Sequence, residues 1–476
     1  MDAAGAVPCW IMSHARISES IPAEIGAFDL VIVDEASQSD LWALPAILRG
    51  KKILVVGDHK QVSPDAGFIA AQRIQELKQR FLAEQPYRDE MTPEKSLYEL
   101  AVRVYSAANI MLREHFRCVP PIIAYSNRAH YGGQIQPIRI PNATERIDPP
   151  LVDIHVPGGE RDKRDRNDLE AQAIAAEVAA LIADERYAGR TIGVVSLLGT
   201  EQAAYVDAVV RRQCDAGELI RRRFECGDAR NFQGSDRDII FLSMVVDPQN
   251  CRPLSGLMFE QRFNVAASRA RDRMYLVRSV SASDLSDRDL RAGLLAHFDK
   301  PLAADTQESE SLVERCESEF EREVYGELVS RGYRVIPQVK TGAYRIDLVV
   351  EGNGDTRLAV ECDGDEFHGH DRWQHDTARQ RVLERAGWTF WRCFASTWTL
   401  RKEEVFAELL ERLGALGIEP IGAIDRAPSL VEKRTWKPAE EPEAPLPPQM
   451  QQTGDAGDEL PRLDRLGQVH LLAGQE

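Results

Sequence analysis

An apolar run that ends in two adjacent carboxylates constrains the fold of this chain more than any other stretch. Phe28 to Val33 is apolar except for Asp29 and rich in β-branched residues, which predicts a strand buried on both faces. Asp34 and Glu35 follow directly. Strands of an open α/β sheet present their carboxyl ends to the ligand crevice, so we expect both carboxylates to lie there. The alternative is a solvated loop that merely begins with acidic residues.

Two carboxylates in this position have a definite chemistry, because one can bind Mg²⁺ while the other positions an attacking water, as in a Walker B motif. A second predicted buried strand, Lys52 to Val56, is followed by Gly57 and then by Gln61. At the same edge of the sheet, Gln61 would reach a γ-phosphate or its water. The structural alternative is a Gly-Asp turn closed by Pro64.

A phosphate-binding loop is missing from this sequence. No Gly-x-x-x-x-Gly-Lys-Ser/Thr precedes Asp34 or occurs elsewhere. Such a loop supplies backbone N–H groups at a glycine turn together with a lysine. We therefore expect ATP to be a cofactor only if further N-terminal sequence or another chain supplies the phosphate loop.

Composition limits the class of protein. The 476 residues suffice for two or three domains, and the eight cysteines form no Cys-x-x-Cys pair. The absence of such a pair argues against a disulfide framework and against a zinc ribbon. We therefore expect a reducing, cytoplasmic compartment. We expect neither a secretion signal nor a membrane span, because no apolar run approaches ~18 residues. The net charge of −17 does not exclude nucleic acid as a partner, since acidic proteins can carry basic grooves.

Strands and helices alternate between residues 151 and 277, which predicts a second α/β unit with a parallel sheet. Within it, Asn167 and Glu170 match a capping box. Two arginines are candidates for phosphate contacts: Arg117, beside an aromatic residue, and Arg269, on a short helix with apolar neighbours. The alternatives are a surface ion pair for Arg117 and a solvated face for Arg269.

Five stretches, in this order, resemble motifs II, III, IV, V and VI of superfamily-1 helicases of the DNA2/NAM7-like branch, with AAA_11 and AAA_12 domains. They are residues 31–38, 57–64, 112–118, 232–238 and 262–273. Five ordered matches over about 250 residues are far more specific than any one of them.

The resemblance implies a role for each matched residue of the ATP site. Asp34 would bind Mg²⁺ and Glu35 would be the hydrolytic base. Gln61 would sense the γ-phosphate, and Arg117 and Arg269 would complete the site.

The resemblance also implies how the ATP site is coupled to nucleic acid. Gln233 and Gly234 would lie in the loop that links the nucleotide state to the bound strand. Asp236 stands where many relatives have glutamate, which leaves its contact open.

A different pattern begins after a polar, acidic stretch. Three predicted strands follow an amphipathic helix at 317–330, over residues 333–339, 344–350 and 357–362. They place Asp347 in the middle of one strand and Glu361 at the end of the next, within bridging distance if the strands are neighbours. Two hard oxygen ligands suit Mg²⁺, which can activate water. The alternative is a strand that carries Asp347 on a wet face.

This order of helix, strands with Asp and Glu-x-Asp, helix and strand resembles the restriction-endonuclease-like core, specifically relatives of the very-short-patch-repair endonucleases. The resemblance implies that Asp347 and Glu361 bind the metal and that Asp363 adds a third acidic group. It makes His368 the candidate general acid or base and Glu321, or a neighbour, a supporting acid on the helix. Asp363 replaces the usual lysine.

We therefore predict an α/β chain with several parts. They are a partial first RecA-like domain (1–136), a complete second RecA-like parallel-sheet domain (137–300), a linker (301–316), a small α/β restriction-endonuclease-like domain (317–415) and a disordered tail rich in proline and acidic residues (427–476).

The predicted function is the C-terminal part of an ATP-dependent superfamily-1 DNA helicase that carries a metal-dependent endonuclease and acts in DNA processing, repair or defence. Its partners would be single- or double-stranded DNA and an N-terminal region or subunit with a phosphate loop, but no membrane. One alternative is a non-catalytic module that binds nucleic acid or a partner through a degenerate NTPase. Another is a translocase subunit whose phosphate loop is on a separate chain.

Overall fold

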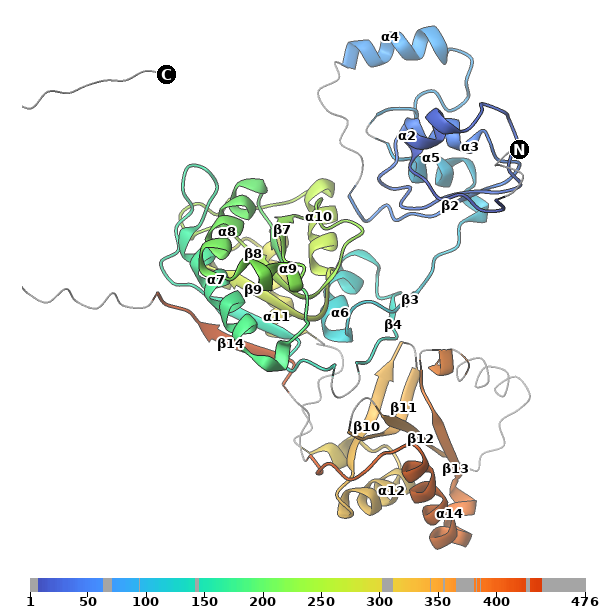
Figure 1. The fold of residues 1–476 in the computed structure, drawn as a ribbon, viewed down its shortest axis with the longest axis vertical. Helices are drawn as coiled ribbons and strands as arrows, with labels where there is room; N and C mark the ends of the chain where they lie inside the picture. The colour runs from blue at the N-terminus through green and yellow to red at the C-terminus, as the bar shows by residue number, and fades with distance from the viewer. Residues whose placement is uncertain are drawn as a thin grey trace, which may run out of the picture. The chain divides into compact units, whose positions relative to one another are not determined.

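The structure is a computed structural model, drawn in Figure 1. It describes residues 7–62, 71–93, 95–141, 145–301, 311–342, 344–353, 356–364, 381, 383–385, 387–424 and 429–438. Within these residues, no helix is both long and apolar enough to cross a membrane.

The N-terminal part contains a short parallel pair of strands, β1 (Val31–Val33) and β2 (Ile53–Val55). Val33 packs against a small core with Ala43 and Leu97. Ile32 is 58% exposed, so the prediction that the first strand is buried on both faces is wrong, and Leu54 at 49% shows that the second strand is not fully buried either. The reason is that the packing partners in the described residues lie against the Val33 face of the pair.

Several short helices accompany these strands. They are α2 (His14–Ser20), η1 (Leu41–Ala43), α3 (Leu44–Ile47), α4 (Ala71–Phe81) and α5 (Leu97–Val104). A capping box formed by Ser96 and Glu99 begins α5, because each side chain bonds to the backbone N–H of the other residue.

Six parallel strands form the main sheet, in the order β14-β5-β9-β8-β6-β7. Their bounds are β5 (Leu151–His155), β6 (Ile192–Ser196), β7 (Glu225–Asp228), β8 (Arg237–Ser243), β9 (Ala270–Arg278) and β14 (Val431–Thr435). Strand β6 is buried along its whole length, as expected for a parallel strand covered on both faces. The predicted α/β class with a RecA-like parallel sheet is confirmed.

Two separate cores line this sheet. One contains residues of α6 (Pro120–His130), α10 (Leu257–Ala267) and α11 (Leu290–Asp299). The other contains residues of α7 (Asp168–Ala183), α8 (Thr200–Gln213) and α9 (Ala216–Arg221). Each core includes side chains of the sheet itself, so both of its faces are covered.

Helix α6 belongs to one of the two cores of the main sheet. Ile122 and Ile123 of α6 lie in the same core as Phe263 of α10. Strand β4 (Gln136–Pro137), which follows α6, pairs in parallel with β3 (Glu114–His115), which precedes it.

The predicted capping box at α7 is half right. The Asn167 side chain accepts a hydrogen bond from the backbone N–H of Glu170 at 3.1 Å. The Glu170 carboxylate is fully buried and instead accepts from the Ser243 hydroxyl at 2.7 Å and the Val245 N–H at 2.9 Å. Tertiary contacts therefore replace the local return bond that the sequence pattern predicts.

A second, four-stranded sheet has the order β10-β11-β12-β13. Its strands are β10 (Arg334–Thr341), β11 (Tyr344–Glu351), β12 (Arg357–Asp363) and β13 (Phe390–Phe394), and its helices are α12 (Glu319–Ser330) and α14 (Ala395–Ala415). The first three strands are antiparallel and β12 and β13 are parallel. This is the smaller α/β domain that the sequence predicts.

The segment just before residue 317 packs in the core of the smaller domain. The short helix η5 (Leu312–Arg315) contributes Leu312 to the core of this domain, and Cys316 lies in the same core. The polar composition of residues 281 to 316 hides these apolar positions.

The predicted disordered tail contains a strand. Residues Val431–Thr435 form β14, which pairs in parallel with β5 at the edge of the main sheet. Two ion pairs hold it: Arg434 with Glu177 of α7 at 3.0 Å and Lys433 with Asp299 of α11 at 2.5 Å. The prediction of disorder is wrong for this segment, and residues 439–476 lie outside the described part of the chain.

Candidate active sites

The two carboxylates that follow β1 lie in a tight turn with exposed side chains. The backbone N–H of Glu35 donates to Asp34 Oδ1 at 2.9 Å, and Gln38 Nε2 donates to Glu35 Oε2 at 3.2 Å. Glu35 has a positive φ of 52°, which is uncommon for a residue other than glycine. The next residue, Ala36, is fully buried and anchors the turn. Asp34 and Glu35 are therefore presented to solvent at the carboxyl end of β1.

Gln61, which follows β2, contacts the arginine that follows α10. Arg269 Nη2 donates to Gln61 Oε1 at 3.2 Å, and Arg269 Nε donates to the Val265 carbonyl at 3.2 Å. Gln61 Nε2 in turn donates to Asp58 Oδ2 at 3.2 Å. The structure thus brings together two residues that lie 208 positions apart in the sequence.

Arg269 lies just beyond α10 and not within the helix, and it is only 2% exposed. Burial lowers the pKa of its guanidinium to about 10, and nearby Arg117 acts in the same direction, while the charge of Glu35 raises it. Among the described residues, no carboxylate forms an ion pair with it. A buried cation held by neutral oxygen atoms suits a phosphate anion, so the donor set fits ATP.

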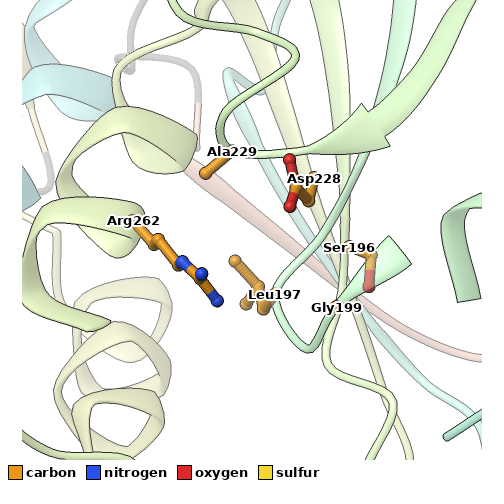
Figure 2. Close-up of a pocket in the computed structure, with 6 residues that line it drawn as sticks. All are labelled: Ser196, Leu197, Gly199, Asp228, Ala229 and Arg262. Atoms are coloured by element: carbon orange, nitrogen blue, oxygen red, sulfur yellow. The ribbon is translucent and has the colours of Figure 1, made fainter. Parts of the chain in front are cut away.

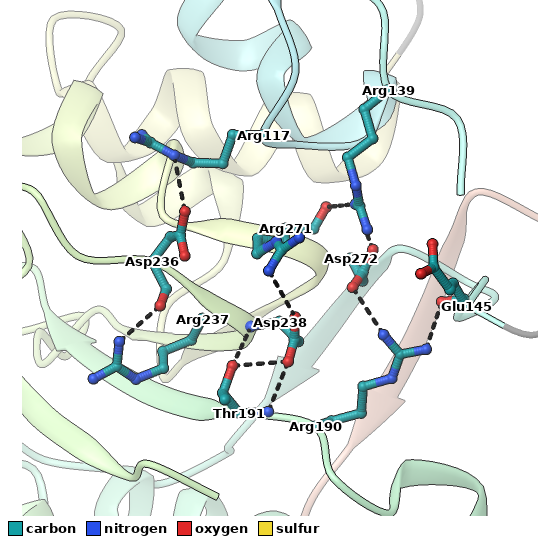
Figure 3. A network of polar contacts seen from close by, with 10 residues as sticks. All are labelled: Arg117, Arg139, Glu145, Arg190, Thr191, Asp236, Arg237, Asp238, Arg271 and Asp272. Carbon is teal, nitrogen blue, oxygen red and sulfur yellow. Dashed lines mark hydrogen bonds and ion pairs between the residues drawn. The ribbon is translucent and has the colours of Figure 1, made fainter. Parts of the chain in front are cut away.

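Arg117, the other arginine predicted for the ATP site, is held by an ion pair. Figure 3 shows its guanidinium beside Asp236, with Nε 3.1 Å from Oδ2. The contact left open for Asp236 by the sequence is therefore with Arg117. Both side chains are about one-third exposed, with 36% for Arg117 and 38% for Asp236, so the pair can open at little cost.

The imidazole of His115 is part of this arrangement. Its Nε2 accepts a hydrogen bond from the Cys118 N–H at 3.0 Å. Burial lowers the pKa of His115 to about 4, and Arg117 and Arg269 nearby act in the same direction. His115 is therefore neutral at physiological pH and fixes the turn that carries Arg117.

Figure 3 also shows two carboxylates of the main sheet that hold neighbouring segments in place. Asp238 accepts from the Thr191 N–H and hydroxyl, both at 2.8 Å. Asp272 pairs with Arg139 at 2.5 Å and with Arg190 at 3.3 Å. These contacts fix the segment around Arg139 against β9.

Three residues around the ATP-site candidates were not predicted. The Tyr131 hydroxyl donates to Asp58 Oδ2 at 2.5 Å, and Asn264 Nδ2 donates to the Tyr131 oxygen at 2.8 Å. Asn264 also donates to the Lys60 carbonyl at 2.9 Å. Asp58 could have been noticed, because it stands in the Gly-Asp pair after β2, but nothing local marks Tyr131 or Asn264.

The predicted coupling loop contacts the segment after β2. Gln233 Nε2 donates to the Val62 carbonyl at 3.2 Å, and Gly234 adopts a positive φ of 77°. Figure 2 shows a nearby pocket at the carboxyl ends of β6 and β7, which the sequence did not indicate. It is lined by Ser196, Leu197, Gly199, Asp228, Ala229 and Arg262.

In the smaller domain, Asp347 and Glu361 lie on neighbouring antiparallel strands. Leu348 and Val360 are paired in the register of β11 and β12, and the two acidic residues are the next positions along. Asp347 Oδ2 accepts from the Cys362 N–H at 2.8 Å, and Glu361 is 3% exposed. Continued by one residue, the register places Asp347 opposite Glu361 on β11 and β12.

The other predicted residues of this domain have different surroundings. Asp363 Oδ2 lies 3.1 Å from Arg392 Nε of β13. The Glu321 carboxylate accepts from the Ser318 hydroxyl at 2.9 Å and from Gln338 Nε2 at 2.7 Å. His368 lies outside the described residues.

Burial raises the pKa of the Cys362 thiol, and the charges of Asp347, Glu321 and Glu361 contribute. These three carboxylates therefore all lie near the buried thiol of Cys362 on β12. Within the described part of the chain, no three His, Cys, Asp or Glu side chains form a ready metal-binding group. Two carboxylates with hard oxygen atoms nevertheless fit Mg²⁺, which keeps several water ligands.

Comparison with known proteins finds three family models that match parts of this chain. Two family models described as AAA domains match, AAA_11 over residues 11–65 and AAA_12 over residues 93–281. A third model, REase_MTES_1575, matches residues 320–413.

Curated relatives are similar at low identity. The Mycoplasma pneumoniae protein named "Uncharacterized ATP-dependent helicase MG140 homolog" is 24% identical over 440 residues, which cover 84% of this chain and 38% of that protein. The corresponding Mycoplasma genitalium helicase is 26% identical over 308 residues, or 61% of this chain and 27% of the relative. The chicken "DNA replication ATP-dependent helicase/nuclease DNA2" is 24% identical over 257 residues, which cover 52% of this chain and 23% of that protein. The chain thus spans 38% or less of these relatives.

Proposed function

We propose that this chain, which matches the AAA_11 and AAA_12 models and the REase_MTES_1575 model, is the motor and nuclease part of a superfamily-1 DNA helicase. Its substrate is DNA, and its work is DNA processing in repair or defence. The observation that carries the nuclease part is the placement of Asp347 and Glu361 side by side on β11 and β12.

In the proposed nuclease, Asp347 and Glu361 would hold a divalent cation, which would supply an activated water and stabilisation of charge on the scissile phosphate. Asp363 forms an ion pair with Arg392, and the pair can contact the DNA backbone. His368 is the proposed general acid or base, because its ordinary pKa near ~6.5 allows proton transfer at neutral pH.

In the proposed motor, Asp34 holds Mg²⁺ and Glu35 positions the attacking water. Gln61 is held by Arg269, so both reach the γ-phosphate together. Arg117 leaves Asp236 to contact the phosphate, and Gln233 and Gly234 pass the change to the DNA strand. A phosphate loop from additional N-terminal sequence or another subunit is required, because this sequence has none.

Plasmid nicking tests the nuclease assignment. The chain should convert supercoiled plasmid to open circles with Mg²⁺ or Mn²⁺, and chelation should stop the reaction. Asp347→Asn keeps an oxygen for the Cys362 N–H but removes the charge, so it should lower the nicking rate by about 100-fold or more. Glu411→Gln, on an exposed position of α14, is the matched control and should cut normally. Persistent cleavage by Asp347→Asn would refute the assignment of this site.

The absent phosphate loop favours a second candidate, a module that binds DNA or a partner without turnover. This candidate is supported if nicking and ATP hydrolysis are both undetectable while filter binding still retains DNA. Its affinity should then fall steeply with salt, because phosphate contacts release counterions.

A further inference from the structure

One residue of the smaller domain, Gln338, has a strained backbone within a strand. Its φ is +56° in the middle of β10, although it is not glycine. Such a conformation is strained for a residue other than glycine and persists where the surrounding structure requires it. Pro337 pairs with Leu348 and Val339 pairs with Ile346, so Gln338 is the residue of β10 that faces Asp347 in the register.

The Gln338 amide has a fixed orientation. Its Nε2 donates to Glu321 Oε2 at 2.7 Å, and that carboxylate oxygen also accepts from the Glu317 N–H at 3.0 Å. Because a carboxylate can only accept here, the nitrogen must point to Glu321 and the oxygen must point away from it.

Gln338 Oε1 is buried and accepts no hydrogen bond among the described residues. An unsatisfied buried acceptor loses its hydration without gaining a hydrogen bond in return. Strain and an unsatisfied oxygen therefore meet in one side chain, at the position opposite Asp347.

We propose that Gln338 is a third oxygen donor of the divalent-cation site, beside Asp347 and Glu361. Amide oxygen atoms bind hard cations as carboxylates do, and a neutral donor adds a ligand without adding repulsion between charges. Glu321 then has the role of orienting Gln338. This inference rests on the proposed nuclease function.

Binding of Mn²⁺ to the full chain, without DNA or ATP, provides a test that does not depend on activity. Electron paramagnetic resonance measures free Mn²⁺ in a titration. The titrations use an Asp34→Asn background, so that the proposed ATP-site carboxylate does not contribute. Gln338→Gly should weaken binding by about 10- to 100-fold. Its melting temperature should not fall, because glycine adopts a positive φ without strain. Gln338→Met, which keeps most of the side-chain volume, should weaken binding equally, and Glu411→Gln should leave it unchanged.

The outcomes separate this inference from the proposed function. If Asp347→Asn abolishes Mn²⁺ binding but both Gln338 variants bind normally, Gln338 is not a donor and the nuclease proposal stands. If Asp347→Asn also binds normally, the cation site itself is wrong. If Gln338→Gly melts well below the unsubstituted chain, the strain argument fails and the residue is structural.

Discussion

Two buried arginines differ in what surrounds their charge. Arg291 is paired with Asp289 at 2.6 Å, and both side chains are almost completely buried. Arg269 has the neutral oxygen atoms of Val265 and Gln61 as its partners. A buried charge without a counter-ion costs desolvation energy, which an incoming phosphate group would offset.

We predict that Arg269→Met does not lower the melting temperature of the nucleotide-free chain, because the substitution removes an uncompensated buried charge. Added pyrophosphate should stabilise the unsubstituted chain, and this stabilisation should be absent from Arg269→Met. Arg291→Met is the control and should lose about 3–5 kcal/mol, because it leaves Asp289 buried and unpaired. Thermal unfolding with and without pyrophosphate measures both effects. Equal destabilisation by the two substitutions would contradict the prediction.

Glu170 should make stability depend on pH. Burial raises its pKa from 4.5 to about 7, against the hydrogen bonds from Val245 and Ser243 that lower it. Because the folded pKa is raised, the contribution to stability is complete below about pH 4.5 and is lost as the pH rises through about 7, by roughly 3 kcal/mol.

Glu170→Gln should flatten this dependence, because an amide stays neutral and its oxygen can still accept from the Val245 N–H. Urea unfolding between about pH 5 and pH 8 measures the free energy of unfolding at each pH. Glu201→Gln, on an exposed position of α8, should keep the slope of the unsubstituted chain. An unchanged slope in Glu170→Gln would show that another group titrates.

At the residue scale, the sequence identifies candidate site residues, but it does not predict the hydrogen bonds that surround them. Gln61, Arg117 and Arg269 are candidates from their neighbours alone, and the structure brings Gln61 and Arg269 into contact. Tyr131 and Asn264 could not be predicted, because their hydrogen bonds depend on how α6 and α10 pack. The roles assigned to these residues stay predictions.

At the scale of elements, β14 is the strand that sequence reasoning could not find. Its residues, Val431–Thr435, include three charged side chains in a stretch next to the proline-rich tail. The strand forms because β5 offers a free edge and because Glu177 and Asp299 pair with its cationic side chains. Strand β6 needs no such help, since its continuous apolar run predicts it directly.

We predict that a chain ending at Ser429 is less stable than one ending at Pro438. The shorter chain loses the parallel pairing of β14 with β5, and each ladder hydrogen bond contributes about 1 kcal/mol net. Faster amide exchange in β5, measured by mass spectrometry, should accompany a lower melting temperature. Similar exchange in both chains would mean that β14 does not stabilise the sheet.

At the scale of the whole molecule, the two proposed sites differ in what they still require. The nuclease carboxylates come from two neighbouring strands of one sheet. The ATP site combines Glu35 and Gln61 with Arg269 from the second domain, but this sequence has no phosphate loop.

We predict that this chain alone hydrolyses no measurable ATP, even with single-stranded DNA, because nothing in its sequence can cradle the β- and γ-phosphates. Release of inorganic phosphate measures the rate. Turnover that DNA stimulates and that Glu35→Gln abolishes would contradict the prediction.

Because the chain returns to the main sheet at β14, mutations in the part of the gene that encodes the smaller domain can also affect that sheet. The whole restriction-endonuclease-like domain lies between α11 and β14 in the chain, and Leu294 of α11 and Val431 of β14 pack in the same core. A frameshift or stop codon within the nuclease would therefore also remove the edge strand of the domain that precedes it. An in-frame excision that joins Pro301 to Ser429 would spare that strand. A gene with this order can therefore lose the restriction-endonuclease-like domain without loss of β14 only by an in-frame deletion of the whole domain.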